Sequence, residues 1–64
     1  MRSVKQFIRE NNLTFEQFGG KLGVSRGHIS KLLTGDRLPS LQLLRKIHEI
    51  TDIPVKDLLY EFTD

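Results

Sequence analysis

The chain has 64 residues, enough for one domain, and a domain of this size buries only about 60% of its unfolded surface. It contains no cysteine, which excludes a disulfide framework and a thiolate metal site. No apolar run approaches the ~20 residues that a membrane-spanning helix needs. We therefore expect a single small domain over residues 1–64, located in the cytoplasm and marginal enough in stability to benefit from a partner chain.

The placement of charge is more informative than the net charge of +2. The bases Lys21, Arg26, Lys31 and Arg37 lie in the central third, where Asp36 is the only acid between positions 17 and 40. Four of the eight acidic residues lie in the last thirteen positions. This separation predicts one face that binds a polyanion and another that avoids it.

A first helix is predicted over about residues 2–11. Val4, Phe7 and Ile8 have the i, i+3, i+4 spacing of a narrow apolar stripe. Asn12 follows, a residue that tolerates the left-handed conformation at a helix end.

A second helix is predicted to begin after Thr14, because Gln17 three residues later completes a capping box. Gly23 is expected to end it. Gly19 and Gly20 lie inside this helix, where each glycine costs about 1 kcal/mol relative to alanine. Close approach of another helix at Gly19 would explain that cost.

A third helix is predicted over residues 26–33, with Ser25 as its N-cap. Ile29, Leu32 and Leu33 form its apolar side, and its other side is small, polar or basic. Residues 34–36 contain a glycine and are expected to end it.

Two further helices are predicted in the last third of the chain. Ser40 caps the fourth, with Leu41, Leu44 and Ile47 expected to point inward. Pro54 suits the first turn of the fifth. The apolar stripe expected on this last helix consists of Val55, Leu58, Leu59 and Phe62.

Two short helices joined by the Gly-Val-Ser turn at 23–25 predict a helix-turn-helix over about residues 14–34. In this motif the second helix enters the major groove of DNA while the first crosses the backbone. The motif needs a glycine in the turn and a small residue where the helices cross, and Gly23 and Gly19 meet those needs.

The stretch from Leu13 to Leu59 resembles the phage lambda repressor/Cro-type (XRE-like) helix-turn-helix family. "KLGVSRGHISKLLTG" followed by "LPS" is the most specific part of the resemblance. It implies an all-α, compact five-helix, lambda-repressor-like DNA-binding domain whose second and third helices form the motif. It also implies binding to palindromic operators as a homodimer and regulation of transcription.

The resemblance implies a set of base-reading residues, and the chemistry of groups near them adds a set of phosphate contacts. The residues expected to read bases are Ser25, Arg26, Gly27, His28, Ser30 and Lys31. The residues expected to contact phosphate are Thr14, Phe15, Thr34 and Arg37. Arg26 and Lys31 can donate to guanine O6 and N7, whereas Phe15 could contact a phosphate only through its amide.

The sequence departs from the family at several positions. Phe15 replaces a common phosphate-binding glutamine, and Asp36 stands where a lysine is common. Ile8 and Leu33 occupy the positions of a frequent arginine–glutamate pair, so we expect them to pack together. His48 replaces a small alanine on the inner side of the fourth helix and is expected to be structural.

The sequence therefore predicts a sequence-specific regulator that binds double-stranded DNA, most simply a small Cro-like repressor encoded by a bacterium or a phage. We expect a homodimer, formed in solution or only on DNA, with no cofactor, metal, membrane or small-molecule ligand. No nucleophile–base pair stands out, so we do not expect an enzyme. The alternative is a protein-interaction module, such as an antitoxin or a partner of the transcription machinery.

Overall fold

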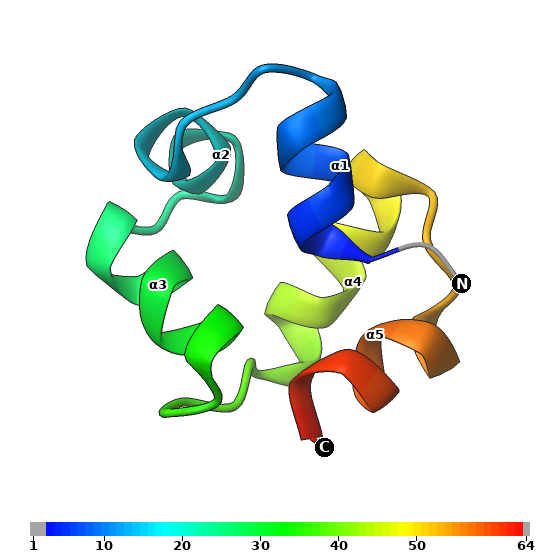
Figure 1. Ribbon diagram of the computed structural model, residues 1–64. Coiled ribbons are helices and arrows are strands. Elements are labelled where there is room, and N and C mark those ends of the chain that lie inside the picture. Colours follow the sequence, from blue (N-terminus) through cyan, green and yellow to red (C-terminus); the bar gives the residue numbers. More distant parts are fainter. Residues whose placement is uncertain (1–2, 64) are drawn as a thin grey trace.

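The computed structural model describes residues 3–63, which form five α-helices joined by short turns (Figure 1). The helices are α1 (Val4–Glu10), α2 (Phe15–Leu22), α3 (Arg26–Thr34), α4 (Leu41–Thr51) and α5 (Val55–Thr63). No strand occurs in this part of the chain, so the predicted all-α, five-helix fold is confirmed. α1 is shorter than expected because Ser3 caps it, accepting a hydrogen bond from the amide of Gln6 at 3.1 Å.

The predicted helix ends are confirmed at the middle of the chain. The hydroxyl of Thr14 accepts from the amide of Gln17 at 3.0 Å, and the Gln17 side chain accepts from the amide of Thr14 at 2.9 Å. Ser25 and Ser40 cap α3 and α4 in the same way, each through a hydroxyl oxygen. Gly23 ends α2 in the left-handed conformation, with φ of 78°. Each such cap typically stabilises its helix by about 1 kcal/mol.

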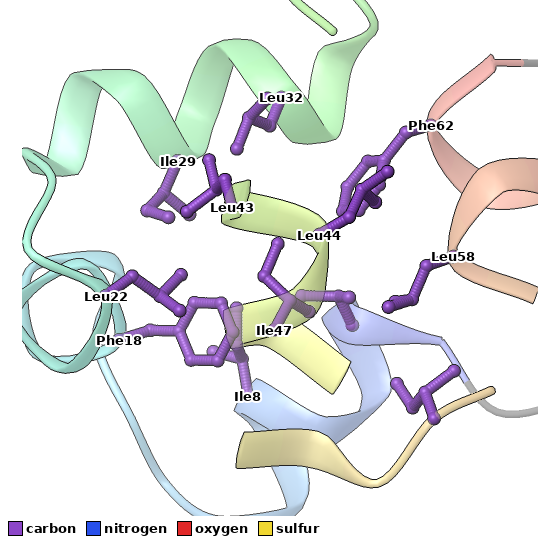
Figure 2. Packing of buried hydrophobic residues seen from close by; sticks show 12 residues of the cluster. Ile8, Phe18, Leu22, Ile29, Leu32, Leu43, Leu44, Ile47, Leu58 and Phe62 are labelled. Carbon is purple, nitrogen blue, oxygen red and sulfur yellow. The ribbon is translucent and has the colours of Figure 1, made fainter. Parts of the chain in front are cut away.

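One hydrophobic cluster holds the helices together, and side chains from the other four helices converge on α4 within it (Figure 2). Ile47 of α4 is almost completely buried, and the rings of Phe7 and Phe18 lie at a centroid distance of 6.1 Å. The buried apolar residues are Val4, Ile8, Phe18, Leu22, Ile29, Leu32, Leu43, Leu44, Ile47, Ile53, Leu58 and Phe62.

The two residues expected to replace an ion pair both join this cluster. Ile8 is buried, and Leu33 is half-buried against the same set of side chains. In Figure 2, Ile8 lies near Phe18 and Ile47. An apolar environment at both positions fits the loss of both charges, and their direct contact stays a prediction.

The prediction for the inward face of α4 is wrong at one residue, Leu41. Leu41 is 72% exposed, whereas Leu43, which the sequence analysis did not select, is buried. At 3.6 residues per turn, burying both Leu43 and Leu44 turns the core-facing side of the helix away from Leu41. In α5, Leu58 and Phe62 of the predicted stripe are buried, whereas Leu59 is wrong as a core residue because it is 44% exposed.

The turn between α4 and α5 is held by side chains that the helical pattern does not reveal. Ile53 is fully buried there. Its amide donates to the Thr51 hydroxyl at 3.2 Å, and that hydroxyl donates to the carbonyl of Ile47 at 2.7 Å. Nδ1 of His48 lies 2.7 Å from the carbonyl oxygen of Ile53, and a carbonyl only accepts, so the ring donates. His48 therefore has the structural contact expected for it.

α5 also caps α1. Both carboxylate oxygens of Glu61 accept from the amide of Val4, at 2.9 and 3.1 Å, across 57 positions of sequence. A carboxylate at a helix N-terminus satisfies a free amide and opposes the positive end of the helix dipole. The contact fastens the first helix to the last.

Replacing Glu61 with alanine is expected to lower the free energy of unfolding by about 1–2 kcal/mol, because a hydrogen bond to a charged group and a helix-dipole interaction are both lost. Glu61→Gln, which keeps one acceptor, should lose less. Glu49→Ala, at an exposed position of α4, is the matched control. Urea unfolding followed by circular dichroism measures all three, and equal midpoints for Glu61→Ala and Glu49→Ala would contradict the assignment.

Candidate nucleic-acid interface

The turn between α2 and α3 sets the two helices against each other. The amide of Val24 donates to the carbonyl of Gly19 at 2.9 Å, and the two helices pack against each other. A Cβ atom on Gly19 would lie 2.6 Å from the carbonyl oxygen of Val24 and 3.3 Å from a side-chain carbon of Ile29. The expected close approach at Gly19 is therefore confirmed, and its nearest neighbour is the backbone of the turn.

α3 lies at the periphery of the bundle (Figure 1). One of its sides is small and polar, and most residues on that side are exposed. Its inward side carries Ile29 and Leu32, which are 1% and 2% exposed. The opposite side follows the i, i+3, i+4, i+7 spacing of one helix face. Four residues make up this outer stripe of α3, namely Gly27, Ser30, Lys31 and Thr34.

The predicted base-reading residues Arg26, Gly27 and Lys31 are exposed on α3, and Ser30 is half-buried beside them. Ser25 is exposed at the start of the helix, and its hydroxyl oxygen accepts from the amide of His28 at 3.2 Å. That bond leaves the hydroxyl hydrogen free to donate. The arrangement supplies cationic and neutral donors on a helix that contains no acidic residue, as the acceptor-rich edge of a guanine requires.

His28 lies apart from the outer stripe of α3. Its side chain is half-buried and lines a surface depression together with Lys46 of α4. The reason is helical spacing, because His28 is one turn before the buried Leu32 and shares its side of the helix. The sequence analysis grouped His28 with the outer face and missed Lys46 altogether, since only the packing of α4 brings Lys46 near α3.

The predicted phosphate contacts at the start of α2 involve two kinds of group. The Thr14 hydroxyl accepts from the amide of Gln17 and keeps its hydrogen free to donate, whereas the contact of Phe15 belongs to its backbone amide. The Phe15 ring is half-buried against the core, so its amide is the group that can face a phosphate. The capping box occupies the amides of Thr14 and Gln17, whereas the amides of Phe15 and Glu16 precede the first intrahelical bond of α2. The exposed carboxylate of Glu16 in the first turn opposes an incoming phosphate.

The predicted phosphate contacts after α3 have unequal surroundings. The Thr34 hydroxyl lies 3.3 Å from Oδ2 of Asp36 and 3.2 Å from the carbonyl of Lys31, so it already has acceptors. A carboxylate beside Thr34 makes it a poor partner for a phosphate. Arg37 is exposed, and its amide donates to the carbonyl of Lys31 at 3.2 Å, which folds the loop back on α3.

Arg37→Ala is expected to weaken binding equally on all duplex sequences and to lower the salt slope by about 0.9, because one phosphate contact releases about one counterion. Asp36→Asn removes the neighbouring negative charge and should strengthen binding instead. Fluorescence anisotropy at several salt concentrations measures both changes. An unchanged slope for Arg37→Ala would remove this residue from the interface.

Among residues 3–63, no group of three histidine, aspartate or glutamate side chains is arranged to hold a metal ion. In the same range, no helix has the length and apolar character needed to cross a membrane.

Comparison with known proteins agrees with this geometry. A family model described as Helix-turn-helix matches residues 4–58, from the start of α1 into α5. No match was found among curated proteins, and none among solved structures. The chain therefore belongs to the XRE, or lambda repressor-like, family of helix-turn-helix proteins, which are DNA-binding transcription regulators.

Proposed function

We propose that this chain is a small Cro-like repressor that binds a palindromic operator as a homodimer. The outer stripe of α3 carries this proposal, because it places Lys31 and Ser30 outward with Arg26 at the helix start and no acidic residue within the helix. Arg26 and Lys31 can donate to guanine O6 and N7, and Ser30 can donate or accept at a base edge. Gly27 between them allows close approach of the backbone to the groove.

Two observations support a homodimer. One helix of nine residues reads only part of a helical turn of DNA, and two copies bound one turn apart, about 34 Å, double the contacts. The described residues also include large apolar side chains that a second copy could cover: Leu38, Leu41, Leu59 and Tyr60. Phe62 of the same helix is buried in the core and is not part of this surface.

The proposed mechanism is occupation of the operator by the dimer. A dimer bound across a promoter would exclude polymerase sterically, with no cofactor or small-molecule ligand. We place this activity in the cytoplasm of a bacterium, with the protein encoded by the bacterium or by a phage. Transcription in vitro from a promoter that overlaps the operator tests repression, and stimulated transcription would contradict it.

Salt dependence of binding to a random-sequence duplex tests the DNA-binding role. Each neutralised phosphate contributes about 0.9 to the slope of log affinity against log salt. A slope of several units, measured by anisotropy with the folded protein, is expected. Absence of binding at low salt would contradict the proposal and would direct attention to a protein partner.

A further inference from the structure

A depression of about 190 Å³ lies between the turn after α2, the start of α3 and the first turns of α4. Its lining combines an apolar part with polar side chains from two helices. The residues that line it are Leu22, Gly23, Val24, His28, Ser40, Gln42, Leu43 and Lys46. None of these described residues is acidic, although Asp and Glu make up eight residues of the chain.

The polar groups of the depression are donors. Lys46 is exposed and supplies an ammonium group, and Gln42 supplies a side-chain amide. The Ser40 hydroxyl accepts from the amide of Leu43 at 3.1 Å, which leaves its hydrogen free. The imidazole of His28 can donate through a ring nitrogen in either tautomer. Such a set of donors fits an anion with several acceptor oxygens.

The position of the depression favours a phosphate of bound DNA as this anion. The major groove is about 12 Å wide, and a helix with its side chains is about 10–12 Å across. When the outer stripe of α3 faces the base edges, the two flanks of α3 therefore lie against the sugar–phosphate rims. His28 lies on the flank that faces α4, and Lys46 extends that flank across the depression.

We propose that this depression holds a phosphate of the DNA strand that borders α3, with Lys46 and His28 as its principal donors. The site rests on the proposed binding of DNA and adds to it two contacts, one of them from α4. It reassigns His28 from base reading to strand positioning. It makes the side of α4 next to α3 part of the interface, which the helix-turn-helix motif alone does not include.

The test compares Lys46→Gln with Arg45→Gln in the full chain. Both residues are exposed on α4, and only Lys46 lines the depression. The two variants therefore remove the same charge from the same helix. Lys46→Gln should lower the salt slope by about 0.9 and weaken binding about 5-fold near 0.1 M salt. The loss of affinity should be the same on the operator and on an unrelated duplex. His28→Ala should also weaken binding to both duplexes by an equal factor.

The outcomes of this experiment separate failure of the phosphate site from failure of the proposed function. Equal slopes for Lys46→Gln and Arg45→Gln, with wild-type DNA binding intact, would overturn the site while leaving the proposed function standing. If His28→Ala weakened binding to the operator but not to an operator changed at one particular base pair, His28 would read that base pair. This result would contradict the phosphate site. A wild-type protein that is folded and binds no duplex would overturn the proposed function itself.

Discussion

Lys31→Ala is expected to weaken binding to the operator by about 10- to 100-fold, or about 1.4–2.8 kcal/mol. Lys31 is exposed in the outer stripe of α3, opposite the buried Ile29 and Leu32. An ammonium there can reach guanine O6 and N7 in the major groove. Arg26→Ala should have an effect of similar size, because a guanidinium can donate two parallel hydrogen bonds to one guanine.

The dependence of this loss of affinity on DNA sequence distinguishes base reading from a phosphate contact. If Lys31 reads a base, the loss is large on the operator and small on an operator changed at the contacted base pair. Lys21→Ala is the matched control, since Lys21 is an exposed base in the last turn of α2. An equal loss for Lys31→Ala on every duplex would make Lys31 a phosphate contact and contradict base reading.

Gly19→Ala is expected to destabilise the protein by about 2–3 kcal/mol, because overpacking a tight contact typically costs about 1–3 kcal/mol. The new Cβ would lie 2.6 Å from the carbonyl oxygen of Val24 and 3.2 Å from that of Ser25. Both are backbone atoms of the turn, which cannot move aside as a flexible side chain would. The turn would have to shift, and α3 with it, so DNA binding should fall as well.

Gly20→Ala is the control for this prediction, on the same helix and one residue away. A Cβ on Gly20 meets nothing within 4 Å, so alanine should stabilise α2 by about 0.5–1 kcal/mol through helix propensity. Thermal and urea unfolding of both variants measures the difference. Stabilisation by both substitutions would show that the close approach at Gly19 is not a constraint.

Features that depend on near neighbours in sequence were predictable. The capping box of Thr14 and Gln17, the caps at Ser25 and Ser40, and the left-handed Gly23 each involve residues within a few positions of one another. Their residue types and spacing therefore located the helix-turn-helix, and with it the outer face of α3.

Features that depend on packing between segments distant in sequence were not predictable from the sequence. Leu41 continued the apolar spacing of its helix, yet burial of Leu43 and Leu44 leaves it exposed. The contact between Glu61 and the start of α1 joins residues at opposite ends of the chain and has no local pattern. The approach of Lys46 to His28 likewise arises only when α4 packs beside α3.

Selection of bound sites from a random duplex library at roughly physiological salt tests the central claim most directly. We expect an enriched inverted repeat whose half-sites lie about one helical turn, 34 Å, apart. The same selection with Lys31→Ala should relax the preference at one position in each half-site. No enriched sequence from the folded wild-type protein would contradict sequence-specific binding through α3.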